Sequence, residues 1–249
     1  DNPCADCVLM HNNWLVGTAA KVYRFKEHLA WMVDKDGYYS SPTARYLDFG
    51  NPDPHATLDM ERKALQTAFK IGAATNRIVI LPVFHCHKCG VYGLGGRKEG
   101  CRGGPGDSDT CNYLAHFRLE ALDKSGLPYR EAMFRHHPLV PRGVALADDE
   151  WTEDRHASRE AEDPAIFIAS PKEPSPHTRR GNDVRILTPE DVDKGPSLAE
   201  LRDWFDTPAP VVSFHSLYNV HVNLGGDMED AVMRKWNQGV KKAPYRQYD

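Results

Sequence analysis

The chain has 249 residues, 41% of them hydrophobic, which is enough to bury a substantial core in one large domain or two small ones. A net charge of −4 gives no electrostatic reason to expect nucleic acid or an anionic membrane as a partner, so we expect no nucleic-acid binding. The sequence contains no run of about 18 apolar residues, which excludes a membrane-spanning helix within it.

The first residue is Asp1 rather than Met, and no signal peptide is visible. We therefore expect a processed form or a piece of a longer protein, with any membrane anchor or address signal lying upstream.

The N-terminal part of the chain predicts a strand end, a loop and a helix. Residues 8–10 are apolar and end a buried strand, and a loop follows around 12–17. Apolar residues then recur at helical spacing, which predicts a helix to about residue 31. The stretch DKDGYYSSP at 34–42 is typical of a turn.

Two strand–helix–strand units follow, and together they predict an α/β fold with a parallel sheet. In the first unit, Thr57 is suited to cap a helix with an apolar face. The Cys- and Gly-rich segment 85–112 predicts a loop, and the charged, Pro-rich residues 145–183 predict surface loops. The expected elements are strands at 44–54, 76–84, 183–189 and 210–217, helices at 57–75, 197–205 and 227–237, and a strand or short helix at 113–123.

His11, Gly17 and Lys21 lie in order between the first strand and the first helix. An imidazole at a strand end can bind a divalent metal, a glycine lets the backbone approach a phosphate, and a lysine supplies a positive charge to a diphosphate. Such groups would stabilise a departing nucleotide diphosphate. The alternative is a buried, hydrogen-bonded histidine and a solvated lysine.

The stretch MHNNWLVGTAAKVYRFKEHLAW resembles the C-terminal signature of the nucleotide-diphospho-sugar transferase family, glycosyltransferase family 77. The resemblance implies that His11 binds a divalent metal such as Mn²⁺. It also implies that Gly17 and Lys21 contact the diphosphate of the donor. The residues that would line the nucleotide-sugar site are Asn12, Asn13 and Trp14.

By this resemblance, residues 1–50 are the C-terminal segment of a GT-A type transferase domain, and residues 51–249 form a Rossmann-like α/β domain. The upstream half of the transferase domain, with its Asp-x-Asp metal motif, is expected before residue 1, and without it we expect no transferase activity. The motifs DKD, DSD and DVD, at 34–36, 107–109 and 191–193, are interpreted as solvated turns.

The stretch ALQTAFKIGAATNRIVILP is similar to a helix and strand of plant and algal family 77 proteins, and to the opening of O-fucosyltransferases of the GT-B class. The sugar-nucleotide loop of those enzymes would correspond to Gly50, Asn51 and His55. The alternative, which we favour, is that Asn76 and Arg77 cap the helix and position the strand.

Cys86, Cys89, Cys101 and Cys111 have the number for two disulfides or for a tetrahedral zinc site, to which His85 and His87 could add ligands. The nine residues between Cys101 and Cys111 depart from the paired spacing of a zinc ribbon. Disulfides are favoured if the chain is luminal. Histidines elsewhere have two interpretations, as residues that line a cleft or as packed side chains with backbone partners. The residues concerned are His136, His137 and His215, with Ser216 and Tyr218 beside the last.

The sequence thus predicts a metal-assisted glycosyltransferase that transfers a sugar from a nucleotide-diphosphate donor to a hydroxyl of a glycan or glycoprotein. It names no catalytic base. The resemblance implies the Golgi lumen, reached by a type II membrane anchor outside this sequence. The alternatives are a non-catalytic α/β module that binds glycan or protein, and an intracellular zinc-ribbon protein.

Overall fold

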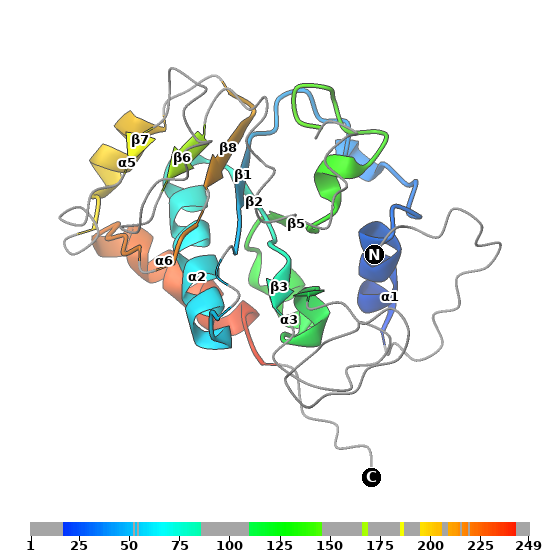
Figure 1. Ribbon diagram of the computed structural model, residues 1–249, viewed down its shortest axis with the longest axis horizontal. Coiled ribbons are helices and arrows are strands. Elements are labelled where there is room, and N and C mark those ends of the chain that lie inside the picture. Colours follow the sequence, from blue (N-terminus) through cyan, green and yellow to red (C-terminus); the bar gives the residue numbers. More distant parts are fainter. Residues whose placement is uncertain are drawn as a thin grey trace, which may run out of the picture.

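The computed structural model describes residues 17–51, 53, 55–85, 110–145, 166–168, 185–186, 195–205, 209–214, 216–218 and 220–242. They form an α/β fold around a parallel sheet, as the sequence predicts (Figure 1). No helix in this part of the chain is sufficiently long and apolar to cross a membrane.

The α-helices are α1 (Thr18–Glu27), α2 (Leu58–Thr75), α3 (Leu119–Ser125), α5 (Leu198–Trp204) and α6 (Gly226–Gly239). Three short 3₁₀ helices are η1 (Lys35–Gly37), η2 (Tyr113–Ala115) and η3 (Phe134–His136). The strands are β1 (Tyr46–Phe49), β2 (Ile78–Ile80), β3 (Phe84–His85), β4 (Thr110–Cys111), β5 (Tyr129–Arg130), β6 (Ile166–Ile168), β7 (Arg185–Ile186) and β8 (Val211–Phe214).

The main sheet has the strand order β5-β2-β1-β8-β6-β7, and every neighbouring pair in it is parallel. The chain moves outward from β1 to β2 and β5, then crosses to the other half and returns to β8 beside β1. The order of the strands therefore reverses between β1 and β8, at the centre of the sheet. Strands β3 and β4 form a separate antiparallel pair.

The domain boundary expected at residue 50 falls inside this sheet. Strand β1 precedes that boundary, yet it pairs with β2 on one side and with β8 on the other. Side chains of β1 also belong to a hydrophobic core shared with α2, α3 and α6. Residues 46–49 are thus part of the same folding unit as the segments that follow.

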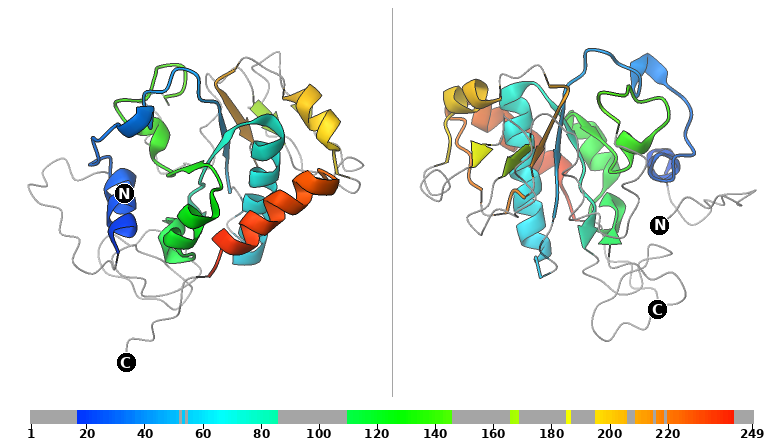
Figure 2. Two further views of the ribbon diagram at one scale, coloured as in Figure 1. Left: turned by 180° about the vertical axis from the view of Figure 1, so that it is seen from behind. Right: turned by 45° about the horizontal axis from the view of Figure 1, so that its top comes forward.

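Strand β1 is buried on both faces of the sheet, because its side chains alternate between two hydrophobic clusters. Leu47 and Phe49 pack in the larger cluster, which α2, α3, α5 and α6 cover. Tyr46 packs in the smaller one with Tyr39 and Phe134, from the segments that contain η1 and η3. Seen from behind, α6 lies across α2 and α3 on the same side of the sheet (Figure 2).

Helix α2 forms where the sequence predicts it, and local signals fix both of its ends. The Thr57 hydroxyl accepts a hydrogen bond from the Met60 N–H at 3.3 Å and caps the first turn. Asn76 ends the helix in the left-handed conformation at φ 52°, and the Arg77 N–H then bonds the Gly72 carbonyl at 2.8 Å. The predicted apolar face is buried against the sheet.

The Arg77 guanidinium is buried and donates to the carbonyls of Tyr46 and Ala209, at 3.3 and 3.0 Å. Burial, with a smaller contribution from Arg45, lowers the pKa of Arg77 to about 10. These contacts join β1 to the residues that lead into β8. Asn76 and Arg77 therefore cap the helix and position the strand, as favoured from the sequence.

Several predicted elements are shorter in the structure. Helix α1 ends at Glu27 rather than near residue 31, and Leu29 beyond it has a positive φ of 56°. Residues 113–123 divide into η2 and the start of α3. Strand β5 has no counterpart among the predicted elements.

Candidate functional site

The carboxyl ends of β1 and β8 lie side by side at the point where the strand order reverses, which is where open α/β sheets bind ligands. The Gly50 N–H bonds the Phe214 carbonyl at 3.0 Å, so the two strands stay paired to their last residues. Asn51 follows β1, Tyr218 follows β8, and helix α2 begins at Leu58 on the same edge.

A buried carboxylate, Glu61 in the first turn of α2, organises this edge of the sheet. Its Oε1 atom accepts hydrogen bonds from the backbone N–H and the ring Nδ1 of His85, both at 2.8 Å. The Asn51 amide nitrogen lies 3.4 Å from the same oxygen and donates to the Val83 carbonyl at 3.1 Å. Glu61 thus ties the start of α2 to β3 and to the residue after β1.

Two polar atoms at this edge, the Asn51 Oδ1 atom and the Tyr218 hydroxyl, are buried and have no hydrogen-bond partner among the residues that the structure describes. Asn51 is 2% exposed and Tyr218 is 7% exposed. Burial raises the pKa of the Tyr218 phenol, and the negative charges of Glu61 and Asp53 raise it further. A buried polar atom with no partner costs about 1–3 kcal/mol, so an arrangement of this kind requires an explanation.

The chemistry of these atoms is specific. The Asn51 oxygen can only accept, so it needs a hydroxyl or an amine from a ligand, whereas the Tyr218 hydroxyl can donate or accept. The N-terminus of α2, which has 18 residues, adds a positive dipole end that favours an anionic group. A ligand that combines hydroxyls with a phosphate would satisfy all three features.

Gly17 and Lys21, predicted to contact the diphosphate, lie at the beginning of α1. Helix α1 packs against α3, beyond the β5 edge of the sheet (Figures 1 and 2). Gly17 has φ 95°, and a Cβ atom on it would lie 2.8 Å from the Glu120 carboxylate. The described residues therefore bring Gly17 beside α3 rather than beside Asn51 and Tyr218. His11, Asn12, Asn13 and Trp14 lie outside the described residues.

Of the four cysteines of the predicted disulfide or zinc site, the structure describes Cys111, in β4, whose sulfur is disulfide-bonded. Cys86, Cys89 and Cys101 lie outside the described residues, as does His87. His85 uses its ring to bond Glu61. Among the residues that the structure describes, no three His, Cys, Asp or Glu side chains are grouped so that they could hold a metal ion.

His137 is a packed side chain. Its ring stacks on Tyr39 with centroids 3.6 Å apart, its Nε2 atom lies 3.0 Å from the Trp31 carbonyl, and its Nδ1 atom accepts from the Leu139 N–H at 3.3 Å. Burial lowers its pKa, so the neutral ring is favoured. Ser216 accepts from the Tyr218 N–H at 3.2 Å and fixes the turn after β8, and His215 lies outside the described residues.

The expected turn at DKD, 34–36, is present. The Asp34 carboxylate accepts from the Tyr39 N–H at 2.7 Å and from the Ser40 hydroxyl, and these bonds, the hydroxyl first, lower its pKa. DSD and DVD lie outside the described residues.

Glu61 and a second buried ion pair were not predicted from the sequence. The spacing in the sequence could have identified Glu61. It stands four residues before Leu65 and therefore on the buried face of α2, where a carboxylate is unusual. Asp48 of β1 pairs with Arg135 at 3.1 Å on the opposite face of the sheet. No local pattern identifies that pair, since its members are far apart in the sequence.

Comparison of the chain with protein-family models, with curated proteins and with solved structures finds no match. A function for this chain can therefore be inferred from the residues at the β1/β8 edge and from the resemblance of the N-terminal stretch.

Proposed function

We propose that the chain belongs to a glycosyltransferase that uses a nucleotide-diphosphate sugar, and that the nucleotide sugar binds at the carboxyl ends of β1 and β8. The acceptor would be a hydroxyl of a glycan or glycoprotein. The proposal includes a GT-A type segment at the N-terminus, a Rossmann-like α/β part after it, and a location in the Golgi lumen.

One observation carries the proposal. Asn51 Oδ1 and Tyr218 Oη are buried at the point where the strand order reverses, and neither has a hydrogen-bond partner within the described part of the chain. Each atom would be satisfied by a hydroxyl of a ribose or hexose ring. A diphosphate in the same ligand would face the first turn of α2. Apolar ligands would leave both atoms unsatisfied, so they are disfavoured.

Each residue of the site then has a defined part in binding. Asn51 accepts from a sugar hydroxyl, and its amide donates to Val83, which fixes the direction of the oxygen. Tyr218 supplies a second hydrogen bond from the β8 side. Glu61 is a positioning residue, because it holds His85 and the start of α2 while its own carboxylate is buried.

The proposed metal dependence rests on His11 alone. The described residues contain no group of three metal-binding side chains. If Mn²⁺ binds, it would be held by His11 with ligands from outside the described residues, and it would supply a Lewis acid for the diphosphate. The predicted control is His11→Ala, which should remove Mn²⁺-dependent nucleotide binding, whereas the same change at the exposed His221 should not.

The proposal is tested by calorimetric titration of UDP- and GDP-sugars into the wild type and into Tyr218→Phe. This substitution removes only an oxygen for which the described residues provide no partner, so the fold should be unchanged or slightly more stable. A lost hydrogen bond to a neutral ligand hydroxyl contributes about 0.5–1.5 kcal/mol, so affinity should fall by about 2- to 13-fold.

Tyr113→Phe is the matched control, since the Tyr113 hydroxyl is also buried and has no partner in the described ranges, but the ring packs between Phe84 and Phe117. It should leave the affinity unchanged. Absence of nucleotide-sugar binding to the wild type, or an equal loss in both variants, would overturn the proposal. Binding of free glycans without nucleotides would favour the non-catalytic module instead.

A further inference from the structure

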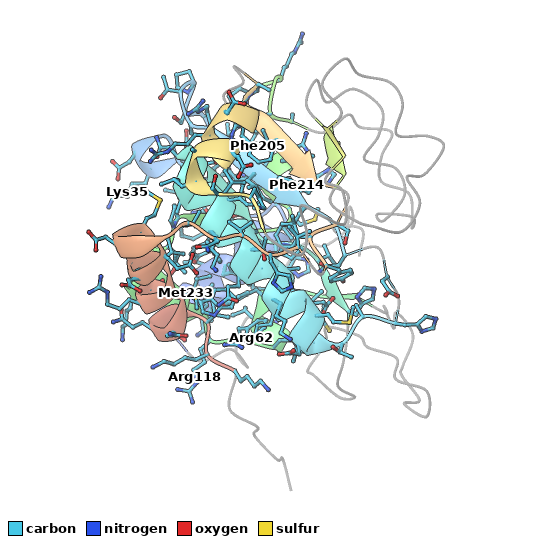
Figure 3. The ribbon with its side chains drawn as sticks, turned by 90° about the vertical axis from the view of Figure 1, so that its left-hand side faces the viewer. Lys35, Arg62, Arg118, Phe205, Phe214 and Met233 are labelled. Atoms are coloured by element: carbon cyan, nitrogen blue, oxygen red, sulfur yellow. The ribbon has the colours of Figure 1, made fainter. Side chains whose placement is uncertain are left out.

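A cavity lies between α3 and α6, away from the β1/β8 edge. It has a volume of about 390 Å³ and is lined by Arg118, Glu120, Ala121, Lys124, Gln238 and Lys241. Three of these six side chains are cationic and one is acidic. Arg118 lies on the surface beyond the last turn of α6 (Figure 3).

Backbone contacts hold the cationic residues of this cavity in place. The Arg118 N–H donates to the Lys241 carbonyl at 2.9 Å, and Phe117 forms an antiparallel bridge with Lys242. Helices α3 and α6 cross closely, since a Cβ atom on Gly239 would lie 2.7 Å from the Ser125 side chain. The positive charges of Arg118 and Lys241 are thus kept on adjacent chain segments by the fold.

These positive charges are not neutralised within the described part of the chain. Arg118, Lys124 and Lys241 form no ion pair there, although Lys63 pairs with Asp59 within α2 and Lys70 of α2 pairs with Glu229 of α6.

Glu120 stands four residues before Lys124, a spacing that permits an ion pair along a helix. No ion pair forms between them, and the Glu120 carboxylate lies against Gly17 of the neighbouring segment. Among the described residues, the lining of this cavity therefore has an excess of positive charge, and Ala121 is the one apolar residue in it.

We propose that this cavity is a binding site for a compact ligand that carries at least two oxyanion charges. Like charges held side by side destabilise the free protein, and an anion between them removes that repulsion. The guanidinium of Arg118 is suited to a bidentate contact with a phosphate or sulfate, and the two lysines add point charges. The lack of an aromatic lining residue disfavours stacking of a base or a sugar ring.

Two sources share this chemistry, a phosphate ester or pyrophosphate and a sulfated glycan. The experiment is isothermal titration of inorganic pyrophosphate, and separately of a disulfated disaccharide, into the 249-residue chain at about 20 mM and about 200 mM salt. We expect saturable binding of one or both anions at low salt that weakens at high salt, and the stronger ligand identifies the source.

Substitutions assign the binding to the cavity. Lys124→Gln and Lys241→Gln should each weaken binding about 2- to 5-fold, which is the contribution of an exposed ion pair. Glu120→Gln should strengthen it by a similar factor, because it removes the one negative charge of the lining. All three side chains are exposed, so the fold should be unaffected, which thermal unfolding would verify.

Lys63→Gln is the matched control, since it removes one exposed lysine charge from α2. Absence of binding of both anions at low salt, or an equal effect of Lys63→Gln and Lys124→Gln, would overturn the proposal. Tyr218→Phe should leave pyrophosphate binding in the cavity unchanged, so failure of this site and failure of the nucleotide-sugar site are distinguishable.

Discussion

Substitution of Glu61 tests whether the buried carboxylate holds the candidate site together. Its Oε1 atom accepts two hydrogen bonds of 2.8 Å from His85, and the third contact, from Asn51 at 3.4 Å, is long enough to contribute little. Glu61 is completely buried. The two variants to compare are Glu61→Gln, which keeps an acceptor oxygen, and Glu61→Ala, which removes it.

The expected magnitudes follow from these contacts. A hydrogen bond to a charged group contributes about 1.5–3 kcal/mol and one between neutral groups about 0.5–1.5 kcal/mol. Glu61→Gln weakens both bonds but ends the burial of a charge, so we expect a loss of about 1–3 kcal/mol in the free energy of unfolding. Glu61→Ala removes the acceptor of both His85 hydrogen bonds and creates a cavity, so we expect a loss of about 3–5 kcal/mol in the free energy of unfolding.

The assay is urea unfolding followed by tryptophan fluorescence and by circular dichroism. Glu120→Gln is the control, because it removes an exposed carboxylate and should change stability by less than about 0.5 kcal/mol. A loss of less than about 1 kcal/mol in the free energy of unfolding for Glu61→Ala would contradict this prediction, because the loss of two buried hydrogen bonds should cost more.

Three further predictions concern the scaffold. Burial lowers the pKa of His137, so the unfolded chain binds more protons than the folded chain as the pH falls below the unfolded pKa of about 6.5. Wild-type stability should therefore fall from pH 7 to pH 5. The urea midpoint of His137→Gln should fall less over the same pH range. Arg135→Met removes the ion pair of the buried Asp48 carboxylate and should cost about 3–5 kcal/mol, whereas the double variant with Asp48→Leu should recover most of it in the same assay. Asn76→Ala should lower stability by about 1–2 kcal/mol because φ is 52° there, and Asn76→Gly should be nearly neutral; equal effects would contradict the conformational argument.

Local signals allowed much of the fold to be predicted. Thr57, the spacing of the apolar residues after it and the Asn76-Arg77 pair define α2 within one residue at each end. The strand–helix–strand order predicts a parallel sheet, and the main sheet is parallel throughout the described strands. Strand β5 was missed because its two residues become a strand only by pairing with β2, and β8 could not be placed beside β1 because strand order depends on long-range contacts.

The candidate site was predicted only in part. Ser216 and Tyr218 are predicted as cleft-lining residues near a strand end, and Asn51 as part of a sugar-nucleotide loop that only a resemblance implies and that is not the favoured interpretation. The structure places all three at the β1/β8 edge. Glu61 was missed because a carboxylate in the first turn of a helix usually faces solvent and interacts with the dipole. Its burial depends on His85, which is 24 residues away in the sequence.

The most direct measurement for the central claim is a crystal structure of the chain with a bound nucleotide-diphosphate sugar. We predict that the diphosphate lies at the first turn of α2, with ligand hydroxyls within hydrogen-bond distance of Asn51 Oδ1 and the Tyr218 hydroxyl. A nucleotide sugar bound elsewhere, with both atoms still lacking partners, would contradict it.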